Sequence, residues 1–329
     1  MEINKVHNID FLNNTLPDKC ANLIIADPPY YKVKGDFDFI WKTFDDYLQD
    51  VEKWAVECKR LLSDNGTLFC YGDAKNIAYT QIIFDKHFNL LNNIVWENTN
   101  DHKQQIRFNE DLRSFAPLTE RILMYQCKYD NFGGEAMFEE FMKPNNPFAI
   151  YLRSEFKKAN VKNTEVAKLF PSKTGGLTGC VANWLNGDNV ITEEQWNKVK
   201  NFLGNEYLQK PYSELLLELE NVKNEFESKR RPFNNTLHLG DVIRLPNYET
   251  NDYEHDTIKP EKLTRMLIKI CTKKDDIIVV PFAGSGTECA MAVKENCNFY
   301  GFEITRKHAE MSNKRVSGIM CNPCLPFEL

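Results

Sequence analysis

Short apolar runs alternate with amphipathic stretches along the first 128 residues. Residues 23–26 are Leu-Ile-Ile-Ala, and Asp27 and two prolines follow them directly. Because proline lacks the N–H group that a sheet ladder needs, this pattern predicts a short buried strand that ends at Asp27. Other short apolar segments predict strands at residues 3–7, 67–71, 90–96 and 121–125.

Apolar residues at helical spacing occur between these strands. Residues 45–62 and 74–84 each predict an amphipathic helix. Asp64-Asn65-Gly66 predicts a turn after the first of them. Strands that alternate with helices through short connections predict a parallel sheet covered by helices on both faces.

The alternation stops between residues 129 and 235, where the pattern is mainly helical. Residues 164–170 and 180–185 predict two short helices on either side of a glycine-containing turn. This arrangement is consistent with a helix-turn-helix, although the turn at 173–179 is longer than usual. Longer helices are predicted at residues 148–160, 192–203 and 212–231.

After residue 236 strands and helices alternate again. Apolar patterns predict strands at 276–280 and 298–302 and helices at 260–271, 286–295 and 305–317. The sheet is therefore split, with a helical module inserted into its middle. We expect residues 1–128 and 236–329 to form the two halves of one α/β domain and residues 129–235 to form the insert.

The composition is that of a globular protein. The 329 residues are 42% hydrophobic and 27% charged. The apolar runs are shorter than a membrane span and the first residues do not resemble a signal peptide, so we expect a cytoplasmic protein. The ten cysteines stand mostly alone in apolar segments and indicate core residues in a reducing compartment. The single Cys-x-x-Cys at 321–324 has no second pair, so we predict no bound metal.

Charge is unevenly distributed along the chain. The net charge of −6 does not suggest nucleic-acid binding, but residues 151–187 carry six Lys or Arg against two acidic residues. Thr178, Asn183 or Trp184 in this segment could contact base edges. The alternative is a small helical subdomain whose lysines are simply solvated. The cations that could contact phosphates are Lys157, Lys158, Lys162, Lys168 and Lys173.

The strand end at Asp27 is the first candidate site. Ligands of open α/β sheets bind at the carboxyl edge of the strands. Asp27 and the carbonyl of Pro28 could accept the two N–H groups of an amino substituent, while the ring of Tyr30 stacks on the substrate. The pattern therefore predicts a planar substrate with an amino group. Tyr31 either supports the pocket wall or packs in the core.

A second candidate site follows the strand at 276–280. Residues 281–287, Pro-Phe-Ala-Gly-Ser-Gly-Thr, contain two glycines that let the backbone approach a ligand at a helix N-terminus. Glu303 ends the next strand, where an acidic residue commonly binds ribose hydroxyls, although it would also suit a helix N-terminus. Together they predict a nucleoside site. Lys259 either reaches a carboxylate or is a solvated lysine before an N-terminal proline.

The order of these motifs resembles the β-group of S-adenosylmethionine-dependent DNA amino-methyltransferases. The resemblance covers residues 1–128 and 236–318. It implies a circularly permuted Rossmann-like methyltransferase sheet with helices on both faces. The catalytic half comes first, the target-recognition domain second and the cofactor half last. The motifs are Asp-Pro-Pro-Tyr at 27–30, His-x-Thr-x-Lys-Pro at 255–260, Pro-Phe-x-Gly-Ser-Gly-Thr at 281–287 and Gly-Phe-Glu at 301–303.

The resemblance also implies roles for single residues. Asp in the first catalytic position favours adenine N6 over cytosine N4, where Ser is more usual. The substrate is then duplex DNA with a flipped base, and the further expected partners are a cognate restriction endonuclease and a second copy of the chain. The residues implied to hold the base are Asp27, Pro28, Pro29 and Tyr30. Those implied to lie along S-adenosylmethionine are Asp10, Lys259, Pro281, Phe282, Gly284, Ser285, Gly286, Thr287 and Glu303.

Two positions depart from the family pattern. Val280 stands where relatives usually carry Asp, and Glu97 stands where they often carry a basic residue. Neither change touches the four catalytic residues, so we expect activity with weaker cofactor affinity. The alternatives are cytosine-N4 methylation, RNA or protein glutamine as acceptor, and a DNA-binding regulator that keeps the fold without turnover, which Val280 favours.

Overall fold

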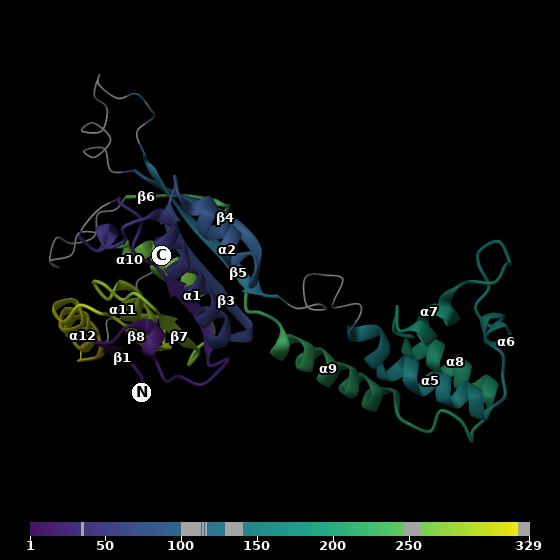
Figure 1. Cartoon of the computed structure of the whole chain (residues 1–329). Coiled ribbons are helices and arrows are strands. Elements are labelled where there is room, and N and C mark those ends of the chain that lie inside the picture. The colour runs from purple at the N-terminus through teal and green to yellow at the C-terminus, as the bar shows by residue number, and fades with distance from the viewer. Residues whose placement is uncertain are drawn as a thin grey trace. The chain divides into compact units, whose positions relative to one another are not determined.

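The computed structural model describes residues 1–33, 36–99, 113, 115, 117–128, 141–246 and 258–321. The chain forms two compact units (Figure 1). Residues 1–128 and 231–329 form the first, which we call the sheet unit, and residues 129–230 form the second, the insert unit. The sheet unit is therefore built from both ends of the chain and the insert unit from its middle.

The sheet unit is organised around one eight-stranded sheet with the order β1-β8-β7-β2-β3-β5-β4-β6. β2 pairs with β7, with Leu23 opposite Ile278, and this pairing joins the two halves of the chain. The prediction of a split α/β sheet is confirmed. The strands are β1 (Lys5–His7), β2 (Ala21–Ala26), β3 (Leu62–Asp73), β4 (Phe88–Asn98), β5 (Thr119–Cys127), β6 (Val242–Leu245), β7 (Ile277–Val280) and β8 (Asn298–Phe302).

The direction of β5 corrects the prediction of a parallel sheet. β5 runs antiparallel to both of its neighbours, β3 and β4, whereas every other strand pair in the described part of the sheet is parallel. The hydrophobic pattern does not show this, because an apolar run reports the burial of a strand and not its direction. The pattern also misses β6, because only Ile243 of its four residues is buried.

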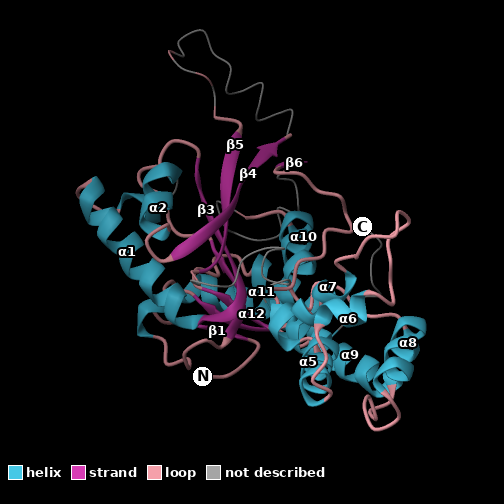
Figure 2. Ribbon diagram, turned by 90° about the vertical axis from the view of Figure 1, so that its right-hand side faces the viewer, coloured by secondary structure: helices cyan, strands magenta, loops and turns pink. Residues whose placement is uncertain are grey.

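Helices cover both faces of the sheet, as predicted. Figure 2 shows α1 (Phe44–Leu61) and α2 (Ile77–Phe84) on one face. The helices on the other face are α10 (Glu261–Cys271), α11 (Thr287–Lys294) and α12 (Arg306–Cys321). The amphipathic pattern therefore identifies all five of these helices, with ends that differ from the prediction by a few residues.

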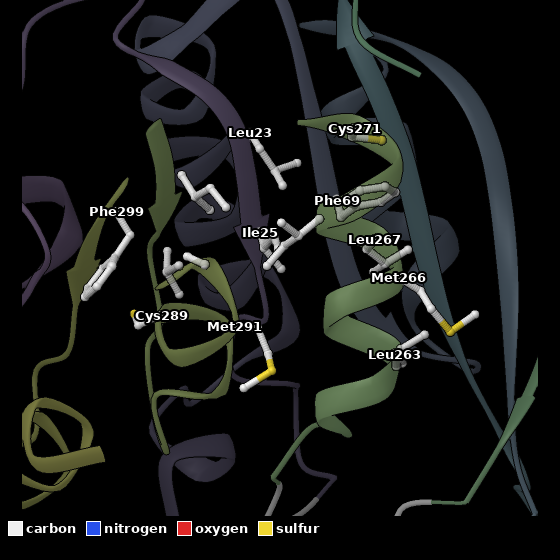
Figure 3. Packing of buried hydrophobic residues seen from close by; sticks show 14 of the residues in the cluster. Leu23, Ile25, Phe69, Leu263, Met266, Leu267, Cys271, Cys289, Met291 and Phe299 are labelled. Carbon is white, nitrogen blue, oxygen red and sulfur yellow. The ribbon is translucent and has the colours of Figure 1, made fainter. Parts of the chain in front are cut away.

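Two apolar cores hold these layers together. Successive residues of a strand point to opposite faces of the sheet. Ile24 accordingly packs in the core that contains α1, whereas Leu23 and Ile25 pack in the core that contains α10 and α11. Figure 3 shows the second core, in which Leu267 of α10 and Met291 of α11 surround these strand residues. The strand at 23–26 is thus buried on both faces, as its continuous apolar run predicts.

The boundary between α1 and β3 differs from the prediction. The predicted turn at residues 64–66 lies inside β3, which begins at Leu62 directly after α1. The pairing with β2 shifts there, from Ala21 opposite Leu62 to Leu23 opposite Thr67. The Asp-Asn-Gly sequence therefore produces an irregularity in the ladder and not a separate turn.

The insert unit is helical, as predicted. Its core includes Phe148, Trp184 and Trp196. Trp184 is 3% exposed and packs edge-on against Phe170, with 5.2 Å between the ring centroids. The predicted contact of Trp184 with base edges is therefore wrong, because this side chain fills the core. The helices are α5 (Pro147–Lys158), α6 (Asn163–Ala167), α7 (Cys180–Asn186), α8 (Glu193–Leu203) and α9 (Tyr212–Lys229).

The two short helices of the insert unit do not form a helix-turn-helix. α6 has only five residues, and residues 168–179 separate it from α7. A helix-turn-helix has a turn of about three or four residues. Pro171 and Leu177 form an antiparallel bridge inside this connection. The segment between the helices is therefore a longer, bridged loop and not a tight turn.

Five of the nine cysteines in the described residues are buried, as predicted for core residues, whereas three are half-buried and Cys321 is exposed. All nine in the described residues are free thiols, and several are fully buried, among them Cys58, Cys70 and Cys289. Cys324 of the Cys-x-x-Cys segment lies outside the described residues. Among the described helices, none combines the length and the apolar character that crossing a membrane requires.

Candidate active site

Three neighbouring strands of the sheet unit end at predicted site residues. Asp27 follows β2, residues 281–286 follow β7 and Glu303 follows β8. Because these strands are adjacent and parallel, their carboxyl ends meet at one edge of the sheet. β5 runs in the opposite direction, so its first residues lie at this edge, where Glu120 pairs with Asp73 at the end of β3.

One cavity of about 1110 Å³ lies at this edge. It brings together all four predicted base-binding residues and most of the predicted cofactor-binding residues. Gly286 and Thr287 do not line it. Its volume exceeds that of a typical small-molecule pocket and suits a nucleoside beside a second ring system. The predicted residues that line it are Asp10, Asp27, Pro28, Pro29, Tyr30, Lys259, Pro281, Phe282, Gly284, Ser285 and Glu303.

Asp27 belongs to a cluster of four polar side chains. The Tyr30 hydroxyl has one proton, which it shares between Asp27 Oδ1 at 2.8 Å and Glu120 Oε2 at 3.2 Å. Lys259 Nζ lies 2.9 Å from Asp27 Oδ2 and 3.2 Å from Glu120 Oε2. Lys259 is 5% exposed, so the interpretation of this residue as a solvated lysine is wrong. Each carboxylate oxygen has two lone pairs, so Asp27 keeps acceptor capacity for a substrate N–H.

Lys259 and Tyr30 both stay protonated in this cluster. Burial acts to lower the pKa of Lys259, but the charges of Asp27 and Glu120 outweigh it and raise that pKa. Burial also raises the pKa of Tyr30, and the two carboxylates raise it further. The site therefore holds a fixed cation and a fixed hydroxyl donor. His255, Asp256 and Thr257, which precede Lys259 in the motif, lie outside the described residues.

The backbone after the two prolines is fixed by Asp38. The N–H of Tyr30 donates to Asp38 Oδ1 at 2.6 Å, and the N–H of Lys32 donates to the Asp38 carbonyl at 2.8 Å. Tyr31 points away from the cavity and packs on Phe44, with 5.1 Å between the ring centroids. Tyr31 is therefore a core residue, while Tyr30 is presented to the cavity.

Glu303 organises the glycine loop. Gly284 N donates to Glu303 Oε2 at 2.9 Å, and Thr305 N donates to Glu303 Oε1 at 2.7 Å. One carboxylate thus ties the loop after β7 to the chain that enters α12. It also lines the cavity, and each oxygen keeps a lone pair for a ribose hydroxyl.

Gly286 and Thr287 stabilise this loop through contacts with α12. Gly286 has a φ of 76°, a conformation that residues with a side chain rarely adopt. A Cβ at this position would lie 2.8 Å from the Cβ of Ser312 on α12. Thr287 is fully buried, and its hydroxyl accepts from Arg315 Nη1 at 2.9 Å. In this structure both residues shape the loop without facing the cavity.

Aromatic side chains form another part of the site. The ring of Phe282 lies 5.0 Å from that of Trp54 and 6.2 Å from that of Phe11, measured between centroids. Asp10 lines the cavity near them and accepts from the N–H of Leu12 at 2.9 Å. Val280 is fully buried in the core and does not line the cavity, so this position contributes no polar group there.

The candidate DNA-binding residues all belong to the insert unit. Asn183 is half-buried on α7. Lys158 Nζ lies 2.6 Å from Oε1 of Glu155, a buried carboxyl that also accepts from the N–H of Leu208. Lys158 is thus engaged within its own unit. The side chains predicted to contact phosphates, all of them exposed, are Lys157, Lys158, Lys162, Lys168 and Lys173.

Sequence reasoning missed several acidic residues of the cavity, and two of them, Glu120 and Glu288, lie near Asp27. Glu120 begins an apolar strand and resembles a solvated strand end in the sequence. Glu288 lies in the first turn of α11 and resembles an acid that favours a helix N-terminus. Both line the cavity, and Glu288 is 4% exposed. Neither position carries a local signal, because only the fold places these residues beside Asp27.

The chain is similar to known proteins over most of its length. The family model N6_N4_Mtase, DNA methylase, matches residues 21–314. The type II methyltransferase M.HinfI of Haemophilus influenzae is 23% identical over 94% of this chain, which spans 66% of that relative's length. The DNA adenine methyltransferase YhdJ of Escherichia coli is 23% identical over 92% of this chain and 78% of its own. A Thermus thermophilus crystal structure, described as a DNA modification methylase complexed with S-adenosyl-L-methionine, is 14% identical with a TM-score of 0.50, covering 95% of this chain and 93% of that one.

Proposed function

The chain belongs to the DNA methylase family N6_N4_Mtase, whose members depend on S-adenosylmethionine, and from this premise we propose that it methylates the N6 amino group of adenine in duplex DNA. The observation that carries the proposal is that residues 27–30 and the glycine loop line one cavity. A methyl donor and an amino acceptor can therefore meet inside it. The similarity to YhdJ, a DNA adenine methyltransferase, supports adenine as the base.

The residues around the glycine loop fit S-adenosylmethionine. Glu303 offers carboxylate lone pairs to the ribose hydroxyls, and Phe282 offers an aromatic surface to the adenine of the cofactor. Lys259 offers a cation to its α-carboxylate. When bound, the cofactor supplies a methyl group activated by a sulfonium.

The strand end at Asp27 supplies the acceptor side of the reaction. The N6 nitrogen of adenine is a poor nucleophile because its lone pair is delocalised into the ring. Asp27 and the carbonyl of Pro28 accept its two N–H groups and draw the nitrogen toward tetrahedral geometry, which frees the lone pair. A base that is stacked in a duplex cannot reach this cavity, so the base must flip out, with the Tyr30 ring as its stacking surface.

The contact between Lys259 and Asp27 has to change when the base binds. Lys259 occupies Asp27 Oδ2 in the described structure, so the substrate N–H must share or replace that contact. Glu120 also contacts Lys259, and the ammonium therefore keeps a carboxylate partner when Asp27 turns to the base. In this scheme Glu120 prevents a buried cation from being left unpaired.

The insert unit is the proposed target-recognition domain. Its exposed lysines suit phosphate contacts, and Asn183 suits a contact with a base edge. A protein that methylates DNA works where the DNA of the cell is, which agrees with the cytoplasmic location expected from the sequence. A restriction endonuclease partner and a homodimer stay predictions from the family resemblance.

The direct test is to follow the methyl group. Purified protein is incubated with tritium-labelled S-adenosylmethionine and unmethylated genomic DNA, and the DNA is hydrolysed to nucleosides that are separated by chromatography. Label in the N6-methyladenine nucleoside supports the proposal, and label in the N4-methylcytosine nucleoside replaces it with the cytosine alternative. Unlabelled DNA, together with measurable cofactor binding, would instead support a non-catalytic regulator.

A further inference from the structure

Glu288 is a buried acid at the edge of the cavity. It follows the glycine loop directly and lines the cavity, although it is only 4% exposed. Within the described part of the chain, its Oε1 atom is buried and has no hydrogen-bond partner. A buried oxygen without a partner destabilises a fold by roughly 1–3 kcal/mol. Such an atom needs an explanation, and beside a binding cavity a ligand can supply the missing donor.

Lys259 Nζ and the two terminal nitrogens of Arg315 have acceptors other than Glu288. Lys259 Nζ contacts Asp27 at 2.9 Å and Glu120 at 3.2 Å, and Arg315 Nη2 donates to Glu261 at 2.7 Å. Neither cation donates to Glu288 Oε1. Charges of both signs therefore act on this carboxyl group. The positive charges of Lys259 and Arg315 stabilise its ionised form, and the negative charge of Asp27 destabilises that form.

Burial has the largest effect on this group. Burial and then Asp27 raise the pKa of Glu288 to about 7. The side chain therefore gains or loses its proton near neutrality, and a cation that enters the cavity beside it favours the ionised form. A purely structural acid in the first turn of a helix gains its interaction with the helix dipole at the surface and has no need of such burial.

S-adenosylmethionine carries two charged groups on its α-carbon. Lys259 offers a cation to the α-carboxylate, and Glu288 offers an acceptor on the wall of the same cavity. The sulfonium has no N–H group and cannot satisfy Oε1, whereas the α-ammonium has three. We propose that Glu288 binds the α-ammonium of the methyl donor and so positions its methionine end. This inference rests on the proposed methyltransferase function.

The test compares two ligands that differ at the α-carbon. Isothermal titration calorimetry at pH 7.5 measures the binding of S-adenosylhomocysteine and of its α-oxo acid analogue, which lacks the amino group. The wild-type protein should bind S-adenosylhomocysteine at least about tenfold more tightly than the analogue. Glu288→Gln should weaken S-adenosylhomocysteine by about 10- to 100-fold and leave the analogue nearly unchanged.

Glu120→Gln is the matched control, because Glu120 lines the same cavity and contacts Lys259. It should change the affinities for the two ligands by the same factor. Equal binding of both ligands by the wild-type protein would overturn the inference without any variant, even where Glu288→Gln does not fold. Equal weakening of both ligands by Glu288→Gln would also overturn it. If the wild-type protein binds neither ligand, the proposed methyltransferase function fails as well.

Discussion

The charged residues proposed as site residues differ in burial between the two units. In the sheet unit, Lys259 and Glu288 are buried beside one cavity. In the insert unit, the candidate DNA-binding lysines are exposed around a mainly apolar core. A buried charge destabilises a fold unless it is paired. Exposed cations exchange partners easily, which suits contact with a phosphate backbone. The difference agrees with the proposed division of roles, in which the sheet unit carries the chemistry and the insert unit recognises DNA.

Removing Asp27 tests the buried cluster most severely. Asp27→Ala should lower methyl transfer by about 10³-fold, because the acceptor for the amino group is lost. Binding of S-adenosylhomocysteine, measured by calorimetry, should stay close to that of the wild-type protein. Glu97→Ala is the control, since Glu97 pairs with exposed Arg244 and lies outside the cavity lining. Retained methyl transfer in Asp27→Ala would refute the role given to the strand end.

The second prediction concerns the pH dependence of stability. Burial and Asp27 raise the pKa of Glu288 from 4.5 to about 7. An acid whose pKa is raised by folding favours the folded state while it is protonated. This contribution is present below the unfolded pKa of 4.5 and is lost as the pH rises through the folded pKa of about 7. Glu288→Gln should therefore raise the free energy of unfolding at pH 8 by up to about 3 kcal/mol and change it little at pH 5. Urea denaturation at both pH values, without ligand, measures the difference. Equal effects at the two pH values would contradict it.

Substitution of one glycine in each unit tests how tightly the chain packs around it. Gly286 and Gly175 both have positive φ, but a Cβ at Gly286 meets Ser312, whereas a Cβ at Gly175 meets nothing within 4 Å. Gly286→Ala should lower the free energy of unfolding by roughly 2–4 kcal/mol, from backbone strain and steric overlap. Gly175→Ala should lower it by only about 1 kcal/mol. Equal losses in urea denaturation would show that the α12 contact contributes little.

The smallest effects are expected from single lysines of the insert unit. Lys162→Gln or Lys168→Gln should weaken DNA binding a few-fold and lower the slope of log affinity against log salt by about 1. Lys198→Gln is the control, because Lys198 is an exposed α8 lysine outside the basic segment and pairs with Glu194. Fluorescence anisotropy across a salt series measures both quantities. Identical slopes for all three variants and the wild-type protein would remove the basic segment from the interface.

Local chemistry explains which parts of this structure could be predicted. The strand at 23–26 and its end at Asp27 follow from one apolar run and two prolines, and the structure confirms both. The amphipathic helices follow in the same way from the spacing of their apolar residues. The direction of β5 could not be predicted, because its middle is buried between two neighbouring strands and a continuous apolar run reports burial and not direction. Glu120 lies at the start of β5, and only the antiparallel direction of β5 brings this end of the strand to the cavity.

The remaining differences also come from long-range packing. Glu288 has the sequence context of a helix-start acid, and only the convergence of β2, β7 and α11 places it near Asp27. Trp184 has the context of an exposed recognition-helix residue, and only the contact with Phe170 places it in a core. The sequence leaves Lys259 open between a solvated and a bound role for the same reason, because its partners Asp27 and Glu120 lie far away in the chain.

The pairing of Leu23 with Ile278 also sets an order of folding. β2 and β7 join only after the chain between them has been made, and closing so long a loop is slow compared with forming local helices. The insert unit, built from one continuous segment, can complete its own core first. During synthesis, β2 can pair with β3 on one side, but its other edge stays open until β7 has been made. An open apolar strand edge favours aggregation during this interval. A nascent chain that stops before β7 has Asp27 but lacks the glycine loop and Glu303, so the proposed methyl transfer has to wait for these later segments.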